Sequence, residues 1–313
     1  MEMSRNEKKK IMSSRKIVFA MALICTLLWG TAFPGVKISY QLLHINSGDT
    51  ASIILLAGSR FFLAGFLCLI FVCLKNRRVT VPKRENIKWI ALNGLVQTVL
   101  QYILFYIGLA HTTGVKASIL TATITFWSVI FARWIFKETI TLRKAVGCGI
   151  GFLGIILINT GGVQTLGGFH FLGDGLLLLS TISASLGAMI SKIASKEENP
   201  ITVTGYQMCM GGLVIMMVGV FAGGKLTFTS MSAVLIFIYL ACASAVAFAL
   251  WTVLHKYNEP GKIAVYNFLT PIFGTFLSAL LLKESLGGMK TMVSLLCVCS
   301  GIWIANSISK NKI

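Results

Sequence analysis

Long apolar runs separated by short polar interruptions dominate the pattern of the chain. Each run is close to the length of about 20 residues that crosses a bilayer as an α-helix. Continuous apolar character, without strict alternation of apolar and polar positions, excludes a membrane β-barrel. The pattern therefore predicts an all-α integral membrane protein with ten spans, at residues 17–40, 50–74, 87–109, 114–136, 143–160, 172–194, 201–222, 231–254, 262–282 and 289–308.

The composition supports a location in lipid. The 313 residues are 56% hydrophobic and 12% charged, with a mean hydropathy of +0.81, whereas soluble domains have about 25% charged residues. The first run lacks a small-x-small cleavage site, so we expect an uncleaved span rather than a signal peptide. All eight cysteines fall within apolar runs without companion ligands, so we expect no disulfide, no metal site and no cofactor.

Positive charge is concentrated in alternate loops. The termini and even-numbered loops hold 21 of the 28 Lys and Arg residues, and the odd-numbered loops hold four. Cytoplasmic loops retain Lys and Arg, so we expect a multi-pass protein of the cell membrane with both termini in the cytoplasm. The net charge of +18 does not indicate a nucleic-acid partner, because the basic residues are not interleaved with aromatics on one face.

An internal repeat relates the two halves of the chain. A shift of 146 residues superimposes four pairs of similar residues: Lys116 on Lys262, Lys137 on Lys283, Glu138 on Glu284 and Thr139 on Ser285. With five spans per half, the second half enters the membrane from the opposite side, which is an inverted-topology repeat. We expect a basic N-terminus at 1–16, five-helix repeats at 17–160 and 161–308, and a C-terminus at 309–313.

Several stretches also resemble a known family. They are LLWGTAFPGVK, SRFFLAGFL, LFYIGLAHTTGVKASIL with FKETIT, TGYQMCMGGLV and PIFGTFLSALLLKESL. In order and spacing they are similar to EamA-type members of the drug/metabolite transporter superfamily, which have two five-helix repeats. The resemblance implies transport of small metabolites, commonly amino acids or related compounds and often outward. Thr125 stands where the second half has Pro271, which predicts a kink in the ninth span but not in the fourth.

Arg60 is the most informative ionisable residue. It lies about ten positions into the second apolar run, where an unpaired charge costs several kcal/mol, so it should face the protein interior. One interpretation is that it binds a carboxylate or phosphate of the substrate through two parallel hydrogen bonds. The other is that it binds backbone carbonyls or polar side chains and serves the structure alone.

Polar and aromatic residues within the spans are further candidates for substrate binding. Gln97 and Gln101 lie one turn apart on one face of the third span, with Tyr102 and Tyr106 on an adjoining face. Such a surface suits a zwitterionic or aromatic substrate, or alternatively hydrogen bonds between helices. The weaker candidates, which could instead pack or anchor at the interface, are Trp29, Trp127, Tyr206, Trp251 and Asn267.

The positions of the acidic residues narrow the range of molecules that the protein is expected to carry. All ten lie in loops or at span ends, which argues against proton antiport of cationic drugs through a midplane carboxylate. Glu138 and Glu284 are interpreted as structural residues at helix ends. We therefore expect an exporter of neutral, zwitterionic or anionic metabolites working by alternating access, with an importer or facilitator as the alternative.

Two further possibilities concern another class of protein and a partner. A membrane-embedded enzyme would need a catalytic set, but three histidines fall at the outer face and His255 at the inner end of its span, without a recognisable motif, so we expect no catalytic residue. Gly147 and Gly151 have the Gly-x-x-x-Gly spacing, which permits either packing within the chain or contact in a homodimer.

Overall fold

The computed structural model describes residues 5–159, 169–285 and 288–306, and within these ranges it contains helices but no strand. Seven helical segments are long and apolar enough to cross a membrane, and three shorter apolar helices bring the total to the predicted ten. The predicted span boundaries are at most three residues from the observed ones, with the largest differences at Arg84 and Tyr257. The predicted boundaries at 160, 161 and 308 and the C-terminus at 309–313 lie outside the described residues.

The helices follow one another in the order of the predicted spans. The first half comprises α1 (Arg5–Met12), α2 (Arg15–Leu42), α3 (Thr50–Asn76), α4 (Arg84–Asn93), the π-helical η1 (Gly94–Leu100), α5 (Gln101–Ala110), α6 (Gly114–Thr121), α7 (Ile124–Phe136) and α8 (Leu142–Asn159). The second comprises the π-helical η2 (Phe171–Gly175), α9 (Leu176–Ala194), α10 (Pro200–Phe221), α11 (Met231–Tyr257), α12 (Pro260–Ile263), the 3-10 helix η3 (Ala264–Phe268), α13 (Leu269–Leu282) and α14 (Gly288–Asn306).

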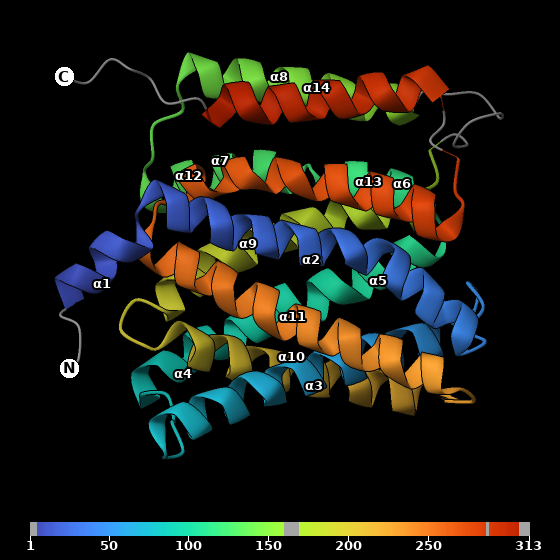
Figure 1. Ribbon diagram of the computed structural model, residues 1–313, viewed down its shortest axis with the longest axis horizontal. Helices are drawn as coiled ribbons and strands as arrows, with labels where there is room; N and C mark the ends of the chain where they lie inside the picture. Colours follow the sequence, from blue (N-terminus) through green and yellow to red (C-terminus); the bar gives the residue numbers. More distant parts are fainter. Residues whose placement is uncertain (1–4, 160–168, 286–287, 307–313) are drawn as a thin grey trace.

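The helices run side by side in a bundle of stacked layers (Figure 1). The pair α8 and α14 forms an outer layer at one face, and the pair α3 and α10 lies toward the other. Helix α1 and the C-terminal end of α14 lie at the same end of the bundle, on the left of Figure 1. We call this end the terminal side and the other end the opposite side.

The main contacts between the two halves have the symmetry expected of two repeats. A helix of one half and its equivalent in the other half make corresponding contacts. The first span, α2, packs on α11 and α13, and its counterpart α9 packs on α5 and α7. The helices α3 and α10 are counterparts that pack on each other, as do α8 and α14. Lys137 and Lys283, paired by the sequence shift, both follow their helix in the left-handed conformation, with φ of 56° and 54°. The inverted five-plus-five architecture predicted from the sequence is confirmed.

The fourth span differs from its prediction. Although it lacks a proline, it is interrupted between α6 and α7, so the expectation of a straight helix was wrong. The Thr123 hydroxyl donates to the Leu120 carbonyl at 2.9 Å, and the Thr121 hydroxyl donates to that of Ser118 at 3.0 Å. Such side-chain bonds compete with helical hydrogen bonds and bend helices. Both halves are therefore broken in their fourth span, by threonines in one and around η3 in the other.

Glycines permit the closest helix contacts. On α8, Gly151 lies against Phe126, and Gly154 lies against the Ser294 carbonyl of α14. A Cβ at Gly301 of α14 would meet the backbone of Gly147 and Gly151. The small-residue spacing noted in the sequence thus serves packing within the chain. The homodimer stays a prediction.

The contact between α3 and α10 yields a first prediction. A Cβ at Gly212 would lie 2.8 Å from the Phe61 carbonyl carbon and against the Phe62 backbone, so Gly212→Ala should force the helices apart and cost about 1–3 kcal/mol. The matched control is Gly149→Ala, because a Cβ at Gly149 meets nothing within 4 Å. Thermal unfolding in detergent should show a lower midpoint for Gly212→Ala alone. Equal midpoints would show that this contact yields without cost.

Candidate functional site

A cavity lies between the two halves of the bundle. Its walls come from seven of the ten spans: those containing α2, α3, α5, α6, α9, α11 and α13. Its free volume is about 120 Å³, comparable to the roughly 150 Å³ of a cavity that holds one benzene molecule. Seven of the ten residues proposed from the sequence line it: Trp29, Arg60, Gln97, Gln101, Tyr102, Trp251 and Asn267.

The cavity extends from mid-bundle toward the terminal side. Its walls include His255, two residues before the end of α11, and Pro260, which begins α12. Both positions are at the terminal side, where α11 ends and α12 starts. Toward the opposite side the lining residues include Phe105, five residues before the end of α5, and Arg60, ten residues after the start of α3. In this conformation, therefore, the lining residues come closer to the helix ends at the terminal side than to those at the opposite side.

The Arg60 side chain is held by several hydrogen bonds but has no acidic partner among the described residues. Its Nε donates to the Leu240 carbonyl and the Ser244 hydroxyl, both at 3.1 Å, and its Nη2 donates to Ser244 at 2.7 Å. Its Nη1 donates to the Tyr106 hydroxyl at 2.6 Å, and the side chain is 4% exposed. In the described part of the chain, no carboxylate lies within ion-pair distance of this guanidinium. Arg60 therefore has the neighbours of a structural anchor and also carries an uncompensated charge at the cavity wall.

Several other polar groups at the cavity lack partners. The Trp29 Nε1, Gln101 Oε1 and Thr270 Oγ1 atoms are buried and form no hydrogen bond with the described residues, and the same holds for both ring nitrogens of His255. Buried polar groups in native proteins are nearly always paired, and an unpaired one costs about 1–3 kcal/mol. A cluster of such groups around one cavity indicates a site that binds a polar molecule.

The aromatic residues form the apolar part of the wall. The rings of Trp29 and Trp251 meet edge to face with centroids 4.8 Å apart, and Trp29 meets Phe248 in the same way at 5.5 Å. Tyr102 lies over Phe61 at 3.8 Å. These rings come from four different spans, so the halves must be assembled before the wall exists. The site can thus hold an apolar or aromatic body between polar ends.

The structure places three of the proposed residues outside this cavity. Tyr106 lies behind Arg60 as its hydrogen-bond acceptor. Trp127 stacks on Phe131 in a cluster between α7 and α9 that shares Ala188 and Met189 with the cavity wall. Tyr206 donates its hydroxyl to the Thr80 carbonyl at 3.2 Å, in the loop before α4. Tyr106 and Trp127 are therefore neighbours of the site, while Tyr206 is not.

His255 is one of the lining residues that sequence reasoning did not select. Its position at a span end suggested an interfacial residue, whereas the side chain is 4% exposed and lies in the cavity wall. The available signal was its spacing from Phe248 and Trp251, seven and four residues earlier, which puts all three on one face of α11.

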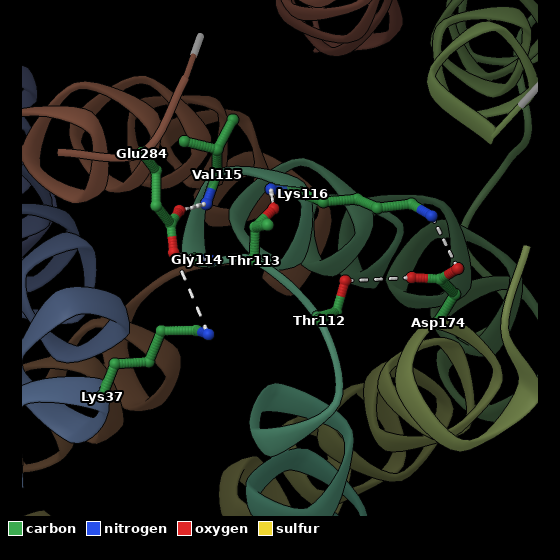
Figure 2. A network of polar contacts seen from close by, with 8 residues as sticks. All are labelled: Lys37, Thr112, Thr113, Gly114, Val115, Lys116, Asp174 and Glu284. Carbon is green, nitrogen blue, oxygen red and sulfur yellow. Dashed lines mark hydrogen bonds and ion pairs between the residues drawn. The ribbon is translucent and has the colours of Figure 1, made fainter. Parts of the chain in front are cut away.

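A polar network ties the helix ends together at the opposite side (Figure 2). The Lys116 ammonium of α6 lies 2.7 Å from Asp174 of η2, and both side chains are almost fully buried, with 2% and 1% exposed. Asp174 also accepts from the Thr112 hydroxyl at 3.2 Å and from the His170 backbone N–H at 2.9 Å. Through this pair, the start of the fourth span is fixed to the start of the sixth.

Glu284 forms the second half of the network. Its carboxylate accepts from the backbone N–H groups of Gly114 and Val115 at 3.0 and 2.9 Å, and thereby caps the N-terminus of α6. Lys37 of α2 lies 3.9 Å away, as Figure 2 shows. Glu138 holds the corresponding position at the terminal side, directly after α7. Both glutamates lie at helix ends, as the sequence indicated.

The fold and the cavity define a polytopic helical membrane protein with a polar site between two inverted repeats. Residues 16–160 and 171–307 of the chain match the EamA-like transporter family. The chain therefore belongs to this family of the drug/metabolite transporter type, and it is a transporter.

Relatives agree with this assignment. The chain is 27% identical to an uncharacterized inner membrane transporter of Escherichia coli, YedA, over 84% of the chain and 80% of the relative. It is 24% identical to an uncharacterized transporter of Synechocystis, over 84% and 82%. A WAT1-related chloroplastic protein of Arabidopsis thaliana is 27% identical over 84% of the chain, which spans 63% of the plant protein's length. A solved crystal structure shares the fold, with a TM-score of 0.68, 15% identity and coverage of 93% and 97%.

Proposed function

We propose that the protein exports amino acids or related small metabolites that carry a carboxylate, by alternating access at the cavity between the repeats. Membership of a transporter family supports the general activity. The particular cargo is supported by one observation above all, the buried Arg60 guanidinium at the cavity wall without an acidic partner in the described residues.

The chemistry of Arg60 favours an anionic group. A guanidinium has five N–H groups, and the protein contacts at Nε, Nη1 and Nη2 occupy one on each nitrogen. One N–H on each terminal nitrogen therefore stays available for a carboxylate, which accepts such parallel bonds in a fork geometry. Among the residues lining the cavity, Arg60 is the single formally charged side chain, so an anionic group there meets no opposing carboxylate.

The rest of the wall suits an amino-acid-like molecule. The amides of Gln97, Gln101 and Asn267 line the cavity, and the buried Gln101 Oε1 has no hydrogen-bond partner among the described residues, so these amides can bind an ammonium or hydroxyl group. Trp29, Phe248 and Trp251 supply an apolar surface for a side chain. A cargo with a carboxylate, a polar amine and an apolar body matches these three parts.

The charge of the loops supports the orientation. The Lys and Arg residues concentrate in the N-terminal segment and in the loops at the terminal side, and such loops stay in the cytoplasm. With the terminal side inside the cell, the cavity in this conformation reaches toward the cytoplasm. That arrangement fits the loading of cargo from inside.

Flux into proteoliposomes tests the proposal. The purified protein should give saturable exchange of radiolabelled neutral, acidic or aromatic amino acids, and the amide derivative of a transported amino acid should compete poorly. Empty liposomes and the variant Arg60→Gln serve as controls. Exchange of cationic amines without exchange of any carboxylate would contradict the proposed cargo. An importer would show the same exchange but accumulate cargo in cells that express it, whereas a facilitator would only equilibrate the cargo across the membrane.

A further inference from the structure

The inner surface of α11 carries polar groups at two separate levels of the cavity. Ser244, Phe248, Trp251 and His255 follow one another at intervals of four, three and four residues, which places them along one face of the helix. Ser244 holds Arg60, and the other three line the cavity. Eleven residues separate Ser244 from His255, a rise of about 16 Å along the helix axis.

This distance exceeds the reach of a single amino acid. The carboxylate and the side-chain tip of a free amino acid are on the order of 8 Å apart. A cargo bound to Arg60 therefore does not contact His255 at the same time. The buried imidazole needs another explanation for its two unpaired nitrogens, because a buried polar group without a partner is destabilising.

Between these levels lies a third unpaired donor. The rings of Trp29 contact both Phe248 and Trp251, with centroids 5.5 and 4.8 Å apart, so the indole lies between the levels of Ser244 and His255. Its Nε1–H is buried and has no acceptor in the described residues. An imidazole always offers at least one N–H when it is not bound to a metal. His255, Trp29 and Arg60 thus present N–H donors at successive levels of one cavity, and none of the lining residues is acidic.

We propose that these donors guide the carboxylate of the cargo through the cavity, with His255 as its first binding station at the terminal side and Arg60 as the last. The inference rests on the proposed function and extends it to the path of the cargo. As the carboxylate moves from the terminal side deeper into the cavity, it replaces the hydrogen bond from one donor with a hydrogen bond from the next. It therefore has a protein donor at every stage at which it has lost water.

A pair of ligands of similar shape, one anionic and one neutral, tests the first station. Benzoate and its neutral analogue benzamide have similar shape and are close to the size of molecule that the cavity accommodates. Their binding in detergent is measured by thermal stabilisation of the purified Arg60→Gln variant, which is the parent protein of this test, because benzoate held at Arg60 would not contact His255. We expect the parent protein to bind benzoate more tightly than benzamide. His255→Phe should weaken benzoate binding about tenfold, the effect of one lost hydrogen bond to a charged group, with benzamide binding little changed.

The matched variant is His255→Gln, which keeps an N–H donor. It should bind benzoate within about threefold of the parent, and it provides the comparison if His255→Phe does not fold. Trp29→Phe repeats the test at the second donor. The inference is overturned if the parent binds no benzoate, if His255→Phe binds it as tightly as the parent, or if both ligands weaken equally.

Transport kinetics separate this inference from the proposed function. In proteoliposomes loaded from the terminal side, His255→Phe should raise the KM for a transported carboxylate about tenfold while the maximal rate changes less than about twofold, because Arg60 remains in place. A merely structural role would lower the maximal rate or the amount of folded protein. If the benzoate results hold but no carboxylate is transported, the proposed function fails while the binding station stands.

Discussion

Replacing Asp174 by alanine is expected to lower the free energy of unfolding by about 3–5 kcal/mol. The substitution leaves the Lys116 ammonium, 2% exposed, without the carboxylate that lies 2.7 Å from it. It also removes the acceptor for Thr112 and for the His170 backbone N–H. Thermal unfolding in detergent should show a midpoint lower by roughly 10 °C.

Two controls identify the cause of this loss. The double variant Lys116→Met with Asp174→Ala should recover most of the stability, because removing both charges leaves no buried ion behind. Lys37→Met tests the neighbouring pair, which is 3.9 Å long and has side chains 22% and 15% exposed. It should cost less than about 1 kcal/mol. A double variant as unstable as Asp174→Ala would show that the hydrogen bonds of Asp174, and not its charge, hold the helix ends.

The positions of the spans were predictable because they depend on local properties. Apolar length, bounding charges and the positive-inside rule act on each segment separately. The observed helices begin and end within three residues of the prediction. The repeat was also recognisable in the sequence, because Lys137 and Lys283 end their helices in the same conformation in both halves. Exchange symmetry then determines which helices pack together.

The buried ion pair and the break in the fourth span were not predictable in the same way. Lys116 and Asp174 are 58 residues apart, and no spacing rule links the start of one span to the start of another. The sequence places both residues near the boundary between a loop and a span, but their burial depends on how α6 and η2 meet. The break after Thr121 depends on hydroxyl groups bonding to nearby carbonyls, a choice that proline-based reasoning does not capture.

The candidate site was partly predictable for a physical reason. Polar side chains in a span avoid lipid, so Arg60, Gln97 and Gln101 had to face the interior, and all three line the cavity. Aromatic residues carry no such constraint, because they are equally stable against lipid, a helix or a cavity. Trp29 and Trp251 accordingly line the site while Trp127 packs elsewhere. Assigning an aromatic residue therefore requires the packing of the helices.

Replacing Arg60 by glutamine is expected to reduce the transport efficiency for a carboxylate cargo by a factor of roughly 100 or more. Two charge-assisted hydrogen bonds to the carboxylate are lost, each worth about 1.5–3 kcal/mol. Arg60→Lys should also lower the transport efficiency, by about tenfold or more. One ammonium group cannot bind Leu240, Ser244 and Tyr106 and still present two parallel donors to the cargo. The measurement is initial exchange rate against cargo concentration in proteoliposomes.

Selectivity distinguishes this role from a structural one, since Arg60 also anchors α3 to α11. Ser244→Ala removes hydrogen bonds from Nε and Nη2 but leaves the charge in the wall. That variant should be less thermally stable than the parent while still preferring a carboxylate cargo over the corresponding amide. Arg60→Gln should lose the preference, because its side chain binds both forms about equally. If Arg60→Lys and Arg60→Gln transport carboxylates as well as the parent, Arg60 is an anchor between helices, and the cargo's charge must be recognised elsewhere.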